Sequence, residues 1–382
     1  MLYTHAPAWV QARQNEAIPM TEDKTTLPPP KKRYEWIDNA RIVAALLIIY
    51  AHMGLFFPNE PHVNNDIAYD IIHSTTYWGR VPFFLILAGY FLGRNITWRK
   101  ACDRALWLLI PFFIWNVLYY LFILADQNLT FHSGDLLKIL GLGAVFSPKI
   151  TICGLDPCIP SIGVSWFLRD IIVLSLLTPI LVRLRLFVVV MLIAAIAYLP
   201  FNTGPQIHAL LAPHTCFYYL LGTCLSNYRI DDAYRILNKG FTPIVLLGFL
   251  LALFFSLFQT LRDHHPMGIS LLGGVFGALM IAQCGVLVEN HLPKFSKWLA
   301  PCGPACFLVF MLHAPLFYVL PRVLPSWYTG SIFIWLIPIP ACALIIAFFL
   351  LMKKYTPWLM PYLGHMKVPK KQPVDAPAAK AS

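Results

Sequence analysis

Long apolar runs follow one another along most of the chain, from about residue 42 to residue 352. Each run is roughly 17–22 residues long, which is enough for a helix to cross a hydrocarbon core about 30 Å thick. The runs are continuously apolar and do not alternate between apolar and polar residues, as the strands of a membrane barrel do. The pattern therefore predicts an all-α polytopic membrane protein.

We expect about ten transmembrane helices, at residues 41–58, 72–93, 105–125, 165–183, 185–200, 207–226, 241–260, 267–288, 303–321 and 331–352. Basic residues are concentrated in alternate connections between them: Lys31, Lys32, Arg33, Arg94, Arg99, Lys100, Arg104, Arg183, Arg185, Arg229, Arg235, Lys239, Lys294, Lys297, Lys353 and Lys354. The opposite connections are nearly free of them. Because basic loops stay on the cytoplasmic side, both termini are expected in the cytoplasm.

The polar ends of the chain set the expected boundaries of this membrane domain. We expect residues 1–33 to be a disordered polar segment, residues 34–354 to form the membrane domain, and residues 355–382 to be a largely disordered cytoplasmic tail. Segment 126–164 is the one long outward connection, and its apolar stretch Leu136–Phe146 is too short to span a membrane.

Composition agrees with a membrane protein and argues against a nucleic-acid partner. Hydrophobic residues make up 58% of the chain and charged residues 12%, whereas soluble domains carry about 25% charge. The formal net charge of +11 lies in short loops between apolar runs, so it orients the protein among the membrane lipids and does not form the basic face of a soluble domain.

Nine cysteines are spread along the chain, mostly inside the predicted spans. Cys153 and Cys158 share one loop, and a disulfide between them is possible if that loop faces an oxidising compartment. No set of His and Cys residues with zinc-like spacing accompanies them, so we expect no metal site.

The first apolar run contains two ionisable residues on one helical face, Arg41 and His52. Eleven residues bring a helix back to within about 20° of its starting direction and rise by roughly 16 Å. Arg41 is therefore placed at the membrane edge and His52 deep inside it, where an ionisable group usually marks a functional site. Asp38 lies three residues before Arg41, within side-chain reach.

Other ionisable residues lie at two depths. Arg41, Arg94, Arg99 and Arg104 gather near the inner face, where they serve either as topology anchors or as a phosphate-binding collar. The outer half collects a second group, which suggests a cavity if the helices converge: His52, Arg80, Arg169, Asp170, His208, His214 and His313. Histidine also suits proton transfer near neutral pH.

Several short motifs occur in order along these runs: Asp38-x-x-Arg41, Arg41-x10-His52, Arg80-Val-Pro-Phe-Phe-x-x-x-x-Gly-Tyr90, Ser165-Trp-Phe-Leu and His313-Ala-Pro315. Together they resemble the integral-membrane acyltransferase family 3, whose bacterial members O-acetylate or O-succinylate cell-surface glycans. The resemblance covers roughly residues 34–352, and its first part, Tyr34 to His52, is similar to the members that acetylate enterobacterial common antigen. Two positions depart from the family pattern in the region of the donor contacts, Ala88 and Ala101.

The resemblance implies an O-acyltransferase in the inner membrane of a bacterium. Cytoplasmic acyl-CoA, with acetyl-CoA as the expected donor, would be bound through its phosphates by Arg41, Arg94, Arg99 and Arg104. A hydroxyl of an extracytoplasmic or lipid-linked glycan would be the acceptor. The catalytic residues would be His52, Arg80 and Asp38. His52 would act as general base or would itself accept the acyl group, and Arg80 would stabilise the oxyanion or orient His52. The expected substrate-binding residues are Trp166, Arg169, Asp170 and His313.

Two other functions fit the pattern of buried charges. A proton-coupled exporter of a small metabolite or lipid-linked sugar also places polar groups at membrane depth, although paired Gly/Pro interruptions in two matched halves are not evident. A membrane scaffold would tolerate replacement of the intramembrane charges.

Overall fold

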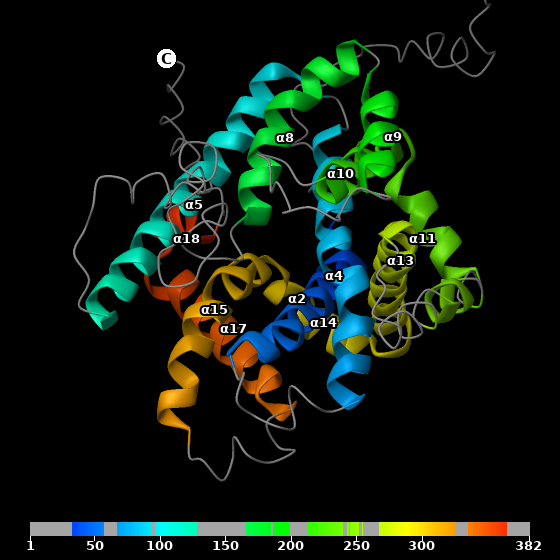
Figure 1. Cartoon of the computed structure of the whole chain (residues 1–382). Helices are drawn as coiled ribbons and strands as arrows, with labels where there is room; N and C mark the ends of the chain where they lie inside the picture. Colours follow the sequence, from blue (N-terminus) through cyan, green and yellow to red (C-terminus); the bar gives the residue numbers. More distant parts are fainter. Residues whose placement is uncertain are drawn as a thin grey trace, which may run out of the picture. The chain divides into compact units, whose positions relative to one another are not determined.

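The computed structural model describes residues 33–56, 67–93, 96–127, 166–184, 186–198, 213–239, 243, 245–251, 254, 267–324 and 335–364. Within these residues every regular element is a helix and no strand occurs, which confirms the all-α fold class (Figure 1). The elements belong to one unit that begins at Glu35.

The helices follow the predicted apolar runs closely. They are α2 (Glu35–Phe56), α4 (Ile67–Gly93), α5 (Trp98–Gln127), α8 (Trp166–Arg183), α9 (Phe187–Tyr198), α10 (Pro213–Leu225), α11 (Ile230–Asn238), α13 (Met267–His291), α14 (Pro293–Leu299), the 3-10 helix η2 (Ala300–Ala305), α15 (Cys306–Val323), α17 (Pro338–Tyr355) and α18 (Met360–Gly364). Of the expected span 241–260, the structure describes short helical pieces.

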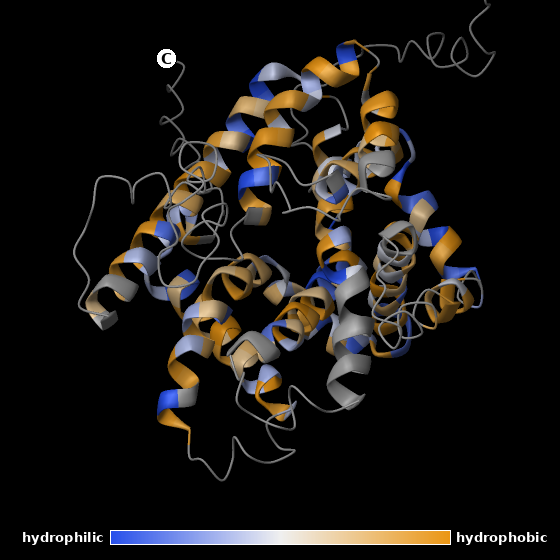
Figure 2. Ribbon diagram, viewed as in Figure 1, coloured by the Kyte–Doolittle hydropathy of each residue, from blue (hydrophilic) through white to orange (hydrophobic). Residues whose placement is uncertain are grey.

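Five helical stretches among the described residues are long and apolar enough to cross a membrane: Glu35–Met53, Trp98–Phe122, Leu271–His291, Pro293–Leu320 and Pro338–Tyr355. Figure 2 shows apolar residues along most of the helices' length, with isolated polar positions inside them. These stretches support a multi-pass membrane protein. The count of ten spans and the cytoplasmic placement of the termini stay predictions.

α4 lies at the centre of the packing, against α2, α10 and α13. Its backbone approaches that of α10 so closely that a Cβ added at Gly89 would overlap the Tyr219 carbonyl, and one at Gly222 would overlap the Ile86 carbonyl. Small residues permit such backbone contact between membrane helices, where van der Waals packing drives association. α5 packs on α8, and α15 packs on both α2 and α17.

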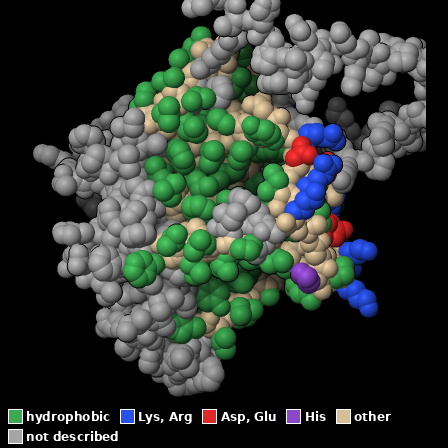
Figure 3. All heavy atoms as spheres, turned by 90° about the vertical axis from the view of Figure 1, so that its right-hand side faces the viewer, with side chains coloured by type: hydrophobic (Ala, Val, Ile, Leu, Met, Phe, Trp, Pro, Cys, Tyr) green, Lys and Arg blue, Asp and Glu red, His purple; other side chains and the backbone are tan. Residues whose placement is uncertain are grey.

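Much of the outer surface is apolar, as expected for helices that face lipid. Figure 3 shows one face on which hydrophobic side chains predominate and charged side chains gather at one edge. α11 illustrates such an edge element, because it buries Ile230 and Leu237 while Arg235 is exposed. The sequence did not predict this amphipathic helix, nor α14, since both are too short to form an apolar run.

The structure describes only part of the expected C-terminal tail and almost none of the long connection after residue 125. Tyr355 ends α17, and the segment expected to be a disordered tail contains α18, where the Leu363 carbonyl accepts a hydrogen bond from Trp115 Nε1 at 3.1 Å. Segment 128–165 lies outside the described residues, and with it Cys153 and Cys158.

Candidate active site

The first turn of α2 brings Asp38 and Arg41 together. Arg41 Nη1 donates a hydrogen bond to Asp38 Oδ1 at 3.2 Å, and the Asp38 side chain is buried. An acid in the first turn of a helix is favoured by the helix dipole, and a spacing of three residues places both groups on one face. The pairing predicted from the sequence is therefore present.

Two neighbouring elements hold this turn in place. Asn39 Nδ2 donates to Ser296 Oγ of α14 at 2.7 Å, and Ser296 Oγ donates to Glu35 Oε2 at 3.2 Å. On the other side, a Cβ added at Gly303 of η2 would lie 2.5 Å from Asp38 Oδ1. The sequence analysis did not identify these residues, although the Pro-Cys-Gly-Pro run at residues 301–304 marks an unusual helix start.

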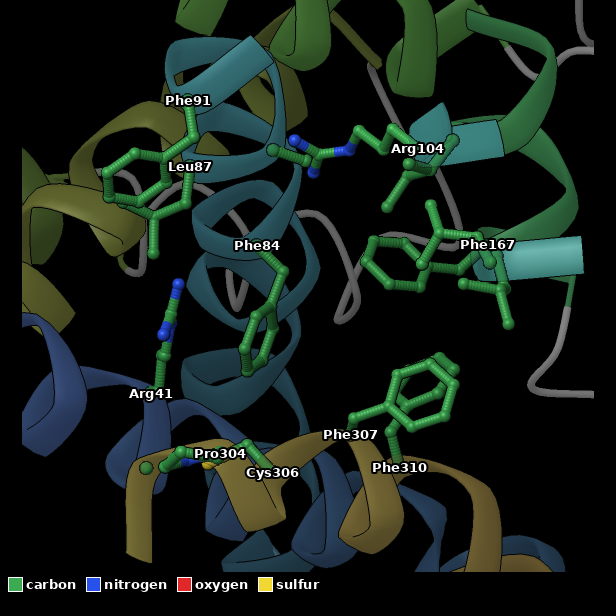
Figure 4. A pocket seen from close by; sticks show the side chains of 15 residues that line it. Arg41, Phe84, Leu87, Phe91, Arg104, Phe167, Pro304, Cys306, Phe307 and Phe310 are labelled. Atoms are coloured by element: carbon green, nitrogen blue, oxygen red, sulfur yellow. The ribbon is translucent and has the colours of Figure 1, made fainter. Parts of the chain in front are cut away.

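A pocket of about 570 Å³ opens beside this turn. Two cations face it, Arg41 from α2 and Arg104 from α5, and their side chains point into the same space (Figure 4). The rest of its lining is apolar: Phe84, Leu87, Ala88, Phe91, Leu108, Phe167, Leu168, Ile171, Gly303, Pro304, Cys306, Phe307 and Phe310. Two guanidinium groups in an apolar pocket form a site suited to an anion that also carries apolar parts.

The two arginines are held differently. The Arg41 guanidinium carbon lies 5.9 Å from the centre of the Phe91 ring and is also bound by Asp38. Arg104 interacts electrostatically with Tyr219 of α10 and with Arg41, and its Nε is buried with no hydrogen-bond partner among the described residues. A buried donor of this kind needs an acceptor, which an anionic ligand would supply.

Of the other two arginines expected near the inner face, the structure describes Arg99. Arg99 lies at the exposed start of α5 and is not among the residues that line the pocket, and Arg94 lies outside the described residues. The pocket therefore brings together two of the four arginines expected to bind the donor.

His52 of α2 and His313 of α15 form a pair, with ring centres 4.9 Å apart. His52 Nδ1 lies 2.8 Å from the Ile48 carbonyl oxygen, and His313 Nδ1 lies 3.0 Å from that of Val309. Because a carbonyl oxygen only accepts, each Nδ1 carries the proton in these hydrogen bonds, and a neutral ring then presents Nε2 as a proton acceptor. His313 Nε2 is buried without a hydrogen-bond partner in the described part of the chain.

Arg80 of α4 belongs to the same region. Its side chain is buried, and it lies close enough to His313 to interact with it electrostatically. The structure thus brings together His52, Arg80 and His313, which the sequence placed at one depth without showing that their helices converge.

The histidine pair does not line the pocket. Phe310 lies between the pocket and the histidine pair. Its ring lines the pocket, and its ring centre is 6.2 Å from that of His313. Phe310 also packs against Phe167 at 5.0 Å, and Phe167 against Phe84 at 6.4 Å. Aromatic rings therefore separate the pocket that Arg41 faces from the histidine pair.

Arg169 and Asp170 form an ion pair on α8. Nε and Nη2 of Arg169 both donate to Asp170 Oδ1, at 3.1 and 3.0 Å, and both side chains are buried. Asp170 interacts electrostatically with Cys216 of α10, and neither member of the pair lines the pocket. α8 begins at Trp166, whose side chain is outside the described part, as is His208.

Comparison with known proteins gives one match. The family model for the acyltransferase domain of acyltransferase family 3 (Acyl_transf_3) matches residues 34–353, which contain every candidate residue described above. Comparisons with curated proteins and with solved structures gave no match. Because the matched segment covers most of the chain and includes the helices that carry the paired histidines and the arginine pocket, the chain belongs to the acyltransferase 3 family.

Proposed function

We propose that this membrane acyltransferase moves an acyl group, acetyl as the expected case, from cytoplasmic acyl-CoA to a hydroxyl of an extracytoplasmic or lipid-linked glycan. The observation that carries the proposal is the apolar pocket faced by Arg41 and Arg104, with the His52–His313 pair beyond its aromatic end. The arginine pocket is suited to a phosphate-bearing thioester, and the histidine pair is suited to proton transfer.

The donor is proposed to lie in the arginine pocket. Coenzyme A combines phosphate groups with a long uncharged arm, and the pocket combines two guanidinium groups with an apolar lining. Its volume of about 570 Å³ lies in the range of small-molecule sites. Arg99 and Arg94 would contact the part of the nucleotide that remains outside, and Asp38 positions Arg41.

The proposed reaction is a direct transfer. Nε2 of His52, or of His313 beside it, takes the proton of the acceptor hydroxyl while the hydroxyl oxygen bonds to the thioester carbon. The carbon–sulfur bond then breaks, and the proton passes from the imidazole to the leaving thiolate, giving an ester and free coenzyme A. Arg80 would stabilise the negative oxygen of the tetrahedral intermediate.

The acceptor is proposed from the class of sugar polymer that the family modifies. Enterobacterial common antigen is the acceptor suggested by the stretch from Tyr34 to His52, and the bacterial inner membrane is the proposed location. Trp166, Arg169 and Asp170 on α8 are proposed to contact the acceptor.

Mass spectrometry of surface glycans from cells with and without the gene tests this function. Wild-type cells should carry glycans heavier by one acyl group per modified sugar, and cells producing His52→Ala should lack that mass. His291→Ala is the matched control, because His291 is exposed at the end of α13. Unmodified glycan masses in wild-type cells, with a metabolite accumulating inside cells that lack the gene, would instead support export.

A further inference from the structure

Three phenylalanines that line the pocket pack against one another in a row, and the last of them contacts the histidine pair. Phe84 comes from α4, Phe167 from α8 and Phe310 from α15, and we refer to them as the aromatic partition. The ring centres are 6.4 Å apart for Phe84 and Phe167 and 5.0 Å apart for Phe167 and Phe310. Figure 4 shows Phe84 between Arg41 on one side and Phe167 and Phe310 on the other.

Phe310 is the member of the partition that touches both sides. Its ring lines the pocket and also packs edge-on against His313, with the ring centres 6.2 Å apart. It is 8% exposed, so the ring is held among neighbouring side chains apart from the face that borders the pocket. The imidazole pair lies immediately beyond, because the ring centre of His52 is 4.9 Å from that of His313.

The order of residues along α15 places the histidine directly after the partition. Phe310 follows Phe307 by three residues and His313 follows Phe310 by three, so each is a neighbour of the next on the helix surface. Because the Phe310 ring lines the pocket and contacts the His313 ring, an acyl group that extends through the pocket toward the imidazoles meets the Phe310 ring first. The distance to this ring then sets the length of acyl chain that fits.

We propose that the aromatic partition, and Phe310 above all, limits the length of the acyl group that the enzyme accepts. This inference rests on the proposed function, since it assumes that the pocket binds an acyl-CoA. Longer chains are excluded because their methylene groups would overlap rings that are packed from three helices and cannot all turn aside. Removal of the Phe310 ring creates an apolar space between the pocket and His313, where additional methylenes can be buried.

Binding of acetyl-CoA, butyryl-CoA and octanoyl-CoA to the purified full-length protein in lipid nanodiscs tests the proposal without requiring the acceptor. Wild type should bind acetyl-CoA more tightly than butyryl-CoA or octanoyl-CoA. Each methylene that becomes buried improves affinity roughly fourfold. Butyryl-CoA has two more methylenes than acetyl-CoA, so Phe310→Ala should raise its relative affinity by up to about sixteenfold, and Phe310→Leu by less.

Two further substitutions make the test specific. Phe113→Ala removes an equal side chain from the exposed surface of α5 and should leave the preference unchanged. Phe307→Ala enlarges the same pocket away from His313 and should change the preference much less than Phe310→Ala. An equal effect of the two pocket substitutions would overturn the proposal, because total pocket volume and not the partition would then set the length.

The outcomes also distinguish the proposed limit on acyl length from the proposed use of acyl-CoA as donor. If wild type binds none of the three thioesters, the proposed donor is wrong. If wild type binds acetyl-CoA and both Phe310→Ala and Phe310→Leu keep its preference for the short chain, the donor assignment stands and the length limit is refuted. Far-ultraviolet circular dichroism of each variant verifies that its helices are intact.

Discussion

At the scale of single residues, the two rings of the histidine pair differ mainly in burial. His313 is fully buried and His52 is partly accessible, while each is oriented by a carbonyl of its own helix. We expect His313→Ala to lower turnover by roughly 10²–10⁴-fold, the usual contribution of a proton-transferring group. Affinity for acetyl-CoA should change little, because His313 does not line the pocket. Parallel measurement of turnover and of donor binding checks both statements.

Arg104 should be a binding residue. Charge-assisted hydrogen bonds contribute about 1.5–3 kcal/mol, so Arg104→Ala should weaken coenzyme A binding roughly 10- to 100-fold. The thioester of pantetheine, which lacks the nucleotide phosphates, should bind wild type and Arg104→Ala with the same affinity. Titration of both ligands against both proteins measures this. A parallel loss for the two ligands would mean that Arg104 shapes the pocket and does not bind phosphate.

Arg41 is also expected to bind the phosphates of coenzyme A, but unlike Arg104 it is held by a carboxylate. Its guanidinium is shared with Asp38, so Asp38→Asn should weaken coenzyme A binding through Arg41 even though it removes a negative charge from the vicinity of an anion. Simple electrostatics predicts the opposite sign. Titration of Asp38→Asn and Arg41→Ala, singly and together, distinguishes the two, because the double variant should bind no worse than Arg41→Ala alone.

At the scale of elements, η2 sets the position of the first turn of α2. A methyl group at Gly303 would overlap Asp38 Oδ1, Cβ and Cγ, so the carboxylate must move and Arg41 with it. We expect Gly303→Ala to raise the KM for acyl-CoA severalfold with a smaller change in kcat. Steady-state kinetics with the acceptor at saturation would reveal this split. A fall in kcat alone would contradict it.

The contact between α4 and α10 should be a determinant of stability. Gly222→Ala improves helix propensity by about 1 kcal/mol, but its methyl group meets the backbone carbonyl of Ile86, which cannot swing away as a side chain can. Overpacking costs about 1–3 kcal/mol, so the clash should prevail and lower the unfolding temperature. Thermal unfolding in detergent measures the difference, with Ala343→Val on the exposed face of α17 as the control.

The apolar runs predicted the elements well because each long membrane helix carries its own signal in the sequence. The ranges 72–93, 165–183 and 267–288 lie close to α4, α8 and α13. The short helices α11 and α14 were not predicted, since helices of this length are stabilised by contacts made elsewhere in the chain. Tyr234 of α11, for example, donates a hydrogen bond to Asn290 Oδ1 of α13 at 3.1 Å.

The site was predictable only where its residues are neighbours in the sequence. Asp38 and Arg41 share one turn, so helix geometry alone brings them together. His52 and His313 meet through the packing of α2 on α15, which no local pattern encodes. Phe310 is one of many aromatic residues in apolar helices, so its position between the pocket and the imidazoles has no signature in the sequence.

At the scale of the whole molecule, the expected orientation in the membrane can be tested with a native thiol. Cys102 is exposed near the start of α5, which the basic connections place on the cytoplasmic side. A membrane-impermeant maleimide should label Cys102 in inverted vesicles and not in intact cells. The difference in labelling between wild type and Cys102→Ser gives the part of the signal that comes from Cys102. Labelling of Cys102 in intact cells would reverse the assigned topology.

The backbone contact between α4 and α10 leaves one wall of the pocket unable to retreat. α4 supplies Phe84, Leu87 and Ala88 to that wall, and the carbonyls behind it already touch the neighbouring helix. Room for an incoming acyl-CoA must then come from the opposite wall, to which η2 and α15 contribute Gly303, Pro304 and Phe307. A small molecule that binds between α4 and the opposite wall would prevent η2 and α15 from moving. It would therefore inhibit the enzyme without binding to Arg41 or Arg104.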